Sequence, residues 1–82
     1  MVYHLQVISA TTNKHTKSRY INIEIDNDYQ NFEDLESQID QKFHKKLSDL
    51  QSINKNEYIY NTREEKEGIS DYVIRIEERN LN

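Results

Sequence analysis

The segment Asn31–Gln51 places the strongest constraint on how this chain folds. Its apolar residues recur three or four positions apart and are Phe32, Leu35, Ile39, Phe43, Leu47 and Leu50. At about 100° per residue these side chains form one stripe along a helix, with polar residues opposite. Asn31 is suited to cap the first turn, where acidic residues follow at the positive end of the helix dipole. We therefore predict a long helix whose stripe is covered by the rest of the chain.

Two segments before this helix alternate between apolar and polar residues, as strands do. They are Val2–Ala10 and Ser18–Asp26, and the β-branched residues of the second favour a strand. The predicted core-facing residues of the two segments are Tyr3, Leu5, Val7, Ile21, Ile23 and Ile25. A hairpin centred near Lys14 pairs Val7 with Ile21, and the alternation makes the choice of face strongly determined.

Two further strands are predicted after the helix, at Asn56–Arg63 and Asp71–Arg79. A hairpin register near Lys66 places Tyr58, Tyr60, Tyr72, Ile74 and Ile76 on the core side. The resulting order is ββαββ, an α+β fold in a single domain, residues 1–82, with one amphipathic helix on one face of a four-stranded sheet. If the last strand pairs in parallel with the first, this architecture resembles the β-grasp fold of ubiquitin; otherwise it is a plain α+β sandwich.

Composition excludes several classes of protein. The chain has no cysteine, so disulfides, thiolate metal sites and a cysteine nucleophile are excluded. The formal net charge of −4 argues against a general binder of nucleic acid or of anionic membranes. No apolar run approaches the roughly 20 residues of a membrane span, and the N-terminus does not have the pattern of a signal peptide. We predict a cytoplasmic protein.

The histidines give little indication of catalysis. His4, His15 and His44 fall in a predicted strand, loop and helix, and none has a second histidine or carboxylate at a convincing metal-ligand spacing. The best pair, Asp40 and His44, is interpreted as a simple contact four residues apart on a helix. Phosphate-loop, nucleophile-elbow and zinc-protease motifs do not occur. We predict no enzymatic activity, no cofactor and no metal.

Acidic residues are concentrated between Glu24 and Asp40, a segment without lysine or arginine, whereas Met1–Ile23 contains no acidic residue. The candidate acidic surface consists of Asp26, Asp28, Glu33, Asp34 and Asp40. One hypothesis is that it imitates nucleic-acid phosphates and enters a basic groove of another protein. The alternative is a solvated helix start that follows the helix dipole, together with charged loops.

The face of the sheet away from the helix is the other candidate binding surface. The residues predicted for partner binding there are Ile8, Tyr20, Asn22, Glu24, Ile59, Val73 and Arg75. An aromatic ring and aliphatic side chains with a mixed polar rim are typical of a binding surface, and tyrosine and arginine dominate binding hot spots. The alternatives are scattered exposed apolar groups or a homodimer that hides the patch.

From these features we predict a small acidic protein-binding module. The abundance of Ile, Asn, Lys and Tyr, which have AT-rich codons, suggests a phage or mobile-element inhibitor of a host defence protein, of the anti-CRISPR or anti-restriction type. A second hypothesis is a ubiquitin-like adaptor or structural protein. A third is a single-stranded nucleic-acid binder that stacks bases on Tyr20, which the acidic Glu24 and Asp26 on the same predicted face disfavour.

Overall fold

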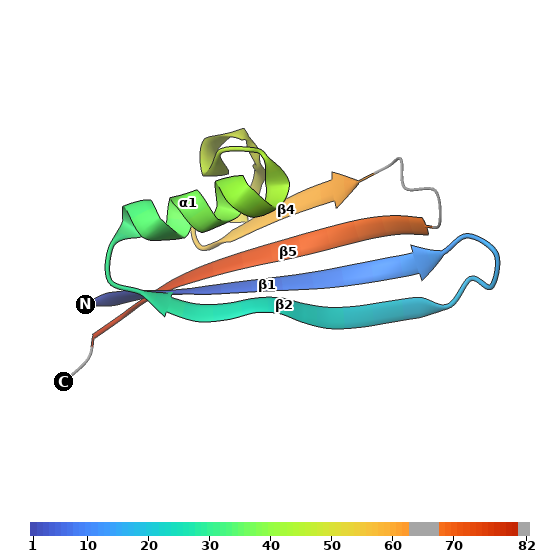
Figure 1. The fold of residues 1–82 in the computed structure, drawn as a ribbon, viewed down its shortest axis with the longest axis horizontal. Helices are drawn as coiled ribbons and strands as arrows, with labels where there is room; N and C mark the ends of the chain where they lie inside the picture. Colours follow the sequence, from blue (N-terminus) through green and yellow to red (C-terminus); the bar gives the residue numbers. More distant parts are fainter. Residues whose placement is uncertain (63–67, 81–82) are drawn as a thin grey trace.

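The computed structural model describes residues 1–62 and 68–80. Figure 1 shows one helix lying across a single antiparallel sheet, with the long β1–β2 hairpin extending beyond it. The elements are β1 (Val2–Asn13), β2 (Arg19–Tyr29), α1 (Phe32–Phe43), a 3-10 helix η1 (Leu47–Asp49), β3 (Gln51–Asn54), β4 (Glu57–Thr62) and β5 (Gly68–Arg79). The dimensions, 48 × 24 × 22 Å, reflect the length of that hairpin. The predicted α+β architecture, with one helix on one face of the sheet, is confirmed.

The sheet has five strands, in the order β2-β1-β5-β4-β3, whereas the sequence predicted four. The additional strand is β3, which pairs with β4 after a tight turn. In that turn the side-chain oxygen of Asn54 accepts the backbone N–H of Asn56 at 2.9 Å, which stabilises the reversal of the chain. Strands β1 and β5 are antiparallel neighbours, so the β-grasp alternative, which needs them parallel, is wrong.

The predicted helix is divided in two. α1 ends at Phe43, because His44 takes a left-handed conformation with φ 55° and donates its backbone N–H to the carbonyl oxygen of Asp40 at 2.8 Å. The chain then turns into η1. Leu47 and Leu50 are still buried in the same core, so the apolar stripe is preserved although the helix is not continuous.

The core lies between α1, η1 and one face of the central strands. Leu35 and Ile39 of α1 are fully buried, as are Leu5, Val7 and Ile74 beneath them. At one end of the core, the ring of Phe43 packs on the rings of Tyr60 and Tyr72, with centroids 5.3 and 5.0 Å apart. The predicted packing of the helix stripe on the inner residues of β1 and β5 is confirmed.

The two hairpins differ in how well their registers were predicted. In β4–β5, Tyr58 pairs with Ile74 and Tyr60 with Tyr72, as expected for a register near Lys66. In β1–β2, Val7 pairs with Ile25 rather than with Ile21, so that predicted register is wrong. The turn lies later than expected because the side-chain oxygen of Asn13 accepts the backbone N–H groups of His15 and Thr16, at 2.8 and 3.0 Å.

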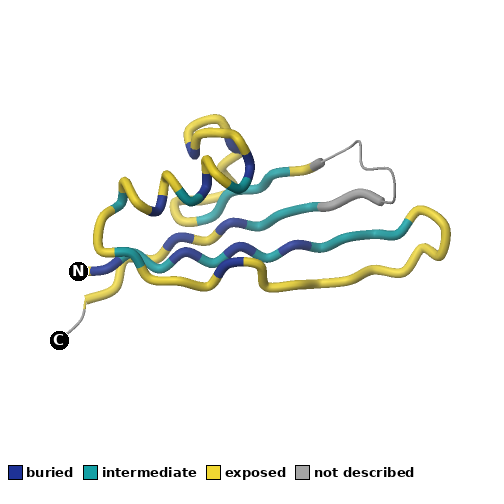
Figure 2. Tube along the Cα trace, in the orientation of Figure 1, coloured by how far each residue is buried: buried dark blue, intermediate teal, exposed yellow. Residues whose placement is uncertain are grey.

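A β-bulge at Glu24 interrupts the β1–β2 hairpin and reverses the faces of its outer half. Val7 pairs with Ile25, but the next residue of β1, Ile8, pairs with Ile23, which leaves Glu24 as an extra residue in β2. Ile23 therefore lies on the opposite face from Ile25. The prediction that Ile21 and Ile23 face the core is wrong: they are 70% and 63% exposed. Figure 2 shows that most of β2 is exposed.

Within the described residues, no helix is long and apolar enough to cross a membrane.

Candidate functional site

The open face is the face of the sheet opposite α1, and an aliphatic row crosses it over four strands. Ile59 of β4 pairs with Val73 of β5, Val73 with Ile8 of β1, and Ile8 with Ile23 of β2. Paired residues lie on the same side of a sheet, so these four side chains form a continuous line. We call this line the aliphatic row. Across residues 1–62 and 68–80, both helical segments pack on the other face. Ile23 is 63% exposed, and Ile8, Ile59 and Val73 are half-buried.

The structure brings together only part of the predicted binding set. Ile8, Ile59, Val73 and Arg75 lie on the open face, as predicted. The remaining three, Tyr20, Asn22 and Glu24, do not, and their predicted placement is wrong. Tyr20 pairs with Thr11 and Asn22 with Ser9, and both of these β1 residues are on the helix side. The bulge is the physical reason, because one extra residue reverses the alternation of everything beyond it.

Ile21 and Ile23 belong to the open face and were missed. Ile21 pairs with Ala10, next to the Ile8–Ile23 pair. Their strict alternation with polar residues indicated a core strand, which is the usual meaning of that pattern. The sequence pattern gave no signal for the change of face. In the structure α1 has only 12 residues and spans about 18 Å, too short to cover a hairpin whose strands have 12 and 11 residues.

Glu24 itself reaches the helix. Its Oε1 accepts a hydrogen bond from Nζ of Lys42 at 2.7 Å, and Lys42 also lies 5.8 Å from the ring centroids of Phe43 and Tyr72. Burial acts to raise the pKa of Glu24, but hydrogen bonds from Lys42 and Ser9 outweigh it and lower the pKa below its usual 4.5. Because of the bulge, the Glu24 carboxylate lies on the helix side and forms an ion pair that links β2 to α1.

Charged residues near the aliphatic row are paired with one another. On one side of the row, Nη2 of Arg75 lies 3.3 Å from Oε2 of Glu57. A hydrogen bond from Asn54, followed by that from Arg75, lowers the pKa of Glu57. This border of the row thus presents little uncompensated charge.

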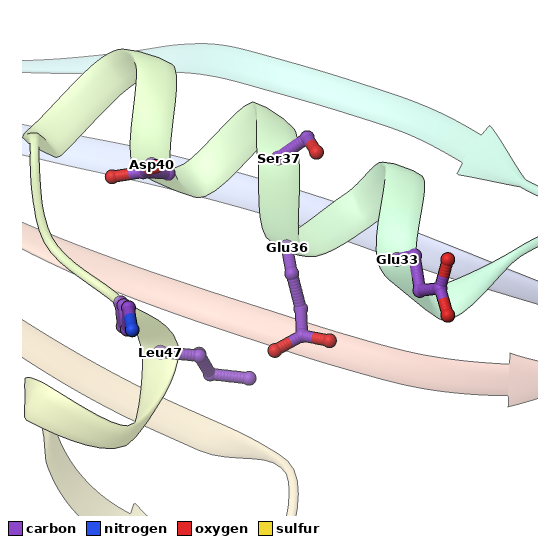
Figure 3. A pocket seen from close by; sticks show the side chains of 6 residues that line it. Glu33, Glu36, Ser37, Asp40 and Leu47 are labelled. Carbon is purple, nitrogen blue, oxygen red and sulfur yellow. The ribbon is translucent and has the colours of Figure 1, made fainter.

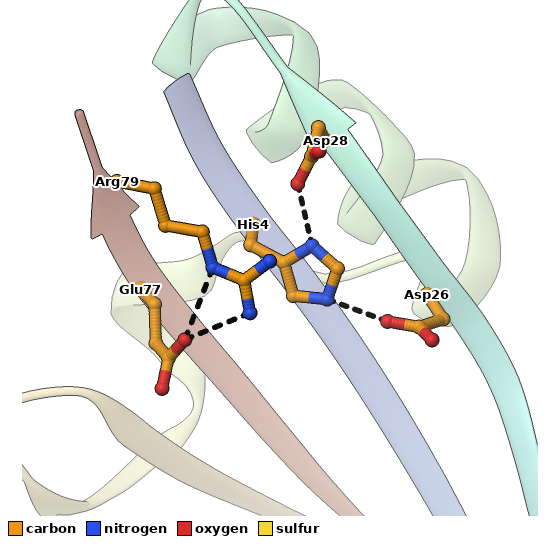
Figure 4. A network of polar contacts seen from close by, with 5 residues as sticks. All are labelled: His4, Asp26, Asp28, Glu77 and Arg79. Atoms are coloured by element: carbon orange, nitrogen blue, oxygen red, sulfur yellow. Dashed lines mark hydrogen bonds and ion pairs between the residues drawn. The ribbon is translucent and has the colours of Figure 1, made fainter. Parts of the chain in front are cut away.

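A network of polar contacts lies at the end of the sheet near the N-terminus (Figure 4). The His4 ring lies between Asp26 and Asp28, with Nε2 and Nδ1 each 2.5 Å from a carboxylate oxygen. Beside it, Nη2 of Arg79 contacts Glu77 at 3.1 Å. The group contains three carboxylates and one arginine, and His4 occupies its centre.

The candidate acidic surface is divided between the two sides of the sheet. Asp26 and Asp28 contact His4 on the open face. Glu33 and Asp40 instead line an open pocket of about 330 Å³ between α1 and η1, with Glu36, Ser37, Lys46 and Leu47 (Figure 3). Asp34 lies in the first turn of α1, where acidic residues suit the helix dipole. The five residues do not form one continuous patch.

Side chains suited to catalysis are dispersed. His4, His15 and His44 lie in β1, in the β1–β2 turn and at the end of α1. Among the described residues, no group of three or more His, Asp or Glu side chains is arranged to hold a metal ion. The open face, with its aliphatic row, is therefore the feature that most favours a functional role.

No protein-family model, curated protein or solved structure gives a significant match to this chain.

Proposed function

We propose that this protein is a small acidic protein-binding module that contacts its partner through the open face and catalyses no reaction. The observation that supports this is the aliphatic row of Ile59, Val73, Ile8 and Ile23. Four aliphatic side chains in one line, bordered by polar residues, are typical of an interaction surface. Isolated exposed apolar residues would need no such explanation, but here the strand pairing places them in contact with one another.

The partner we propose has an apolar ridge or strand that fits along the row. Arg75 is already paired with Glu57 within the protein, so the partner need not supply opposite charges beside the row. Binding of this kind depends mainly on buried apolar area and is expected to change little with salt. The acidic-surface hypothesis makes the opposite prediction, a steep weakening of binding as salt is added.

We propose a host defence protein as the partner, with this chain acting as a phage or mobile-element inhibitor of the anti-CRISPR or anti-restriction type. The support is the acidic composition and the abundance of Ile, Asn, Lys and Tyr, which have AT-rich codons. The base-stacking alternative loses its support, because Tyr20 pairs with Thr11 on the helix side and the open face carries aliphatic side chains instead.

The test compares the same substitution on the two faces. Ile59→Lys places a charge in the aliphatic row, whereas Asn22→Lys places it at an exposed position on the helix side. After the partner is captured from a host lysate and purified, calorimetry measures each dissociation constant. We expect Ile59→Lys to weaken binding at least about tenfold and Asn22→Lys to change it less than about twofold.

Equal affinities for wild type and Ile59→Lys would contradict the proposal. In that case, reversal of Asp28, Glu33 and Asp34 to lysine, with a titration of salt, tests the acidic residues instead.

A further inference from the structure

Strand β2 is the edge of the sheet with the most exposed apolar side chains. It is 11 residues long and, within the described chain, pairs only with β1, so its outer row of backbone N–H and C=O groups faces solvent. Ile21 and Ile23 project from this edge strand and are 70% and 63% exposed. The strand contains no proline or lysine and is not short; its protective features are the bulge and the carboxylates from Glu24 onward, and the stretch from Arg19 to Ile23 before them pairs regularly with β1 and contains no acidic residue.

The charges of β2 are complementary to those of the same strand running in the opposite direction. Arg19 begins the strand on the open face, where it pairs with Thr12, and no acidic residue precedes Glu24 in the chain. Asp26 lies near the other end, also on the open face, where it pairs with Gln6. Its side chain is 51% exposed despite the contact with His4.

Two antiparallel β2 strands centred on Asn22 would cover the exposed isoleucines and would also bring the opposite charges of the two strands together. Ile21 of each copy then lies opposite Ile23 of the other. Beyond that pair, the extra residue at the bulge brings Arg19 of one copy level with Asp26 of the second copy, on the same face. The apolar contacts fall at the centre and one ion pair forms at each end, as a two-fold axis requires.

We infer that this protein forms a homodimer in which two β2 strands pair antiparallel and join the two sheets into one. The two-fold axis runs perpendicular to the sheet, so both open faces point to the same side. Ile23 is the last member of the aliphatic row, and it meets Ile21 of the second copy. The dimer therefore extends the row of each copy across the seam instead of covering it.

Sedimentation velocity over a range of protein concentrations tests the dimer. Wild type is expected to sediment as a dimer at micromolar concentration, and Ile21→Lys to weaken association at least about tenfold. Ile59→Lys, at the far end of the aliphatic row, is the matched control and should stay dimeric while losing partner binding. Circular dichroism confirms that each variant is folded. A monomeric wild type, or a dimer that Ile59→Lys dissociates and Ile21→Lys does not, would overturn the inference.

A charge exchange tests the register. Arg19→Asp and Asp26→Arg should each weaken dimerisation several-fold, and the double variant should restore it. Within one copy the two residues are seven positions apart along β2, about 23 Å, so only contacts between copies can explain the rescue. A double variant that associates no better than the single variants would contradict this pairing.

Discussion

Two isoleucine pairs have the same spacing, Ile23 with Ile25 in β2 and Ile74 with Ile76 in β5, and only the pair in β5 is buried at both positions. Ile74 and Ile76 are 0% and 8% exposed, on one face of a regular strand. Ile25 is 9% exposed, but Ile23, two positions before it, is 63% exposed on the other face. Equal spacing thus gives opposite outcomes, because β2 contains the bulge at Glu24 and β5 pairs with β1 without interruption.

Alternation of apolar and polar residues therefore specifies the two faces of a strand only within a regular stretch. Between the bulge and the β1–β2 turn, α1 no longer covers the sheet (Figure 1). Ile21 and Ile23 would therefore bury little apolar area if they lay on the helix side. On the open face they contact Ile8 and Ala10, and Glu24 gains Lys42. The bulge places each side chain where contacts for it exist, at the cost of interrupting the ladder.

The largest expected effect is on the free energy of unfolding, where the same substitution in β5 and in β2 should give very different losses. Ile74→Ala should cost roughly 2–5 kcal/mol, because it leaves a cavity in a fully packed core. Ile23→Ala, the same substitution at an exposed position, should cost less than about 0.5 kcal/mol. Urea unfolding of both variants measures the contrast, at a protein concentration low enough that association adds no stability. Similar losses in the two variants would mean that Ile23 is packed in the core.

A smaller effect is expected at the bulge, from the Glu24–Lys42 ion pair. Because the folded pKa of Glu24 is lowered, its stabilising contribution is present above the unfolded pKa of 4.5 and is lost as the pH falls through the folded value. Glu24→Gln should cost about 0.2–1 kcal/mol at neutral pH. Below the folded pKa, the variant and wild type should converge.

Urea unfolding of Glu24→Gln and wild type across the acid range measures this convergence. Glu57, whose pKa is also lowered, contributes the same pH dependence to both proteins, so it cancels in the difference. A difference that stays constant across the acid range would show that the ion pair has no role at the bulge.

The smallest effect is expected for Tyr20→Ala. The sequence alone suggested Tyr20 as the anchor of the binding face, but its ring is on the helix side and 57% exposed. We now expect the substitution to change stability by less than about 0.5 kcal/mol and to leave partner binding within about twofold of wild type. Thermal unfolding and calorimetry test this. A tenfold loss of affinity would instead indicate that the partner binds on the helix side of the sheet.

Much of the candidate site was predictable wherever the strands are regular. Ile8, Ile59 and Val73 were placed correctly because β1, β4 and β5 pair without a shift in the region where they lie. Tyr20 and Glu24 were misplaced because the position of a bulge depends on what lies above and below each strand. A period of two carries no information about a single inserted residue.

Four of the strands and most of the core could be predicted from local patterns: an amphipathic stripe from Phe32 to Leu50, alternating strands, and Leu5, Val7 and Ile74 beneath the helix. These follow from local periodicity, which each segment carries alone. Three features could not be predicted from those patterns: the end of α1 at His44, the added strand β3 and the face on which Ile21 and Ile23 lie. The face on which Ile21 and Ile23 lie depends on how far a short helix reaches over a longer hairpin, and that distance is set only when the elements pack together.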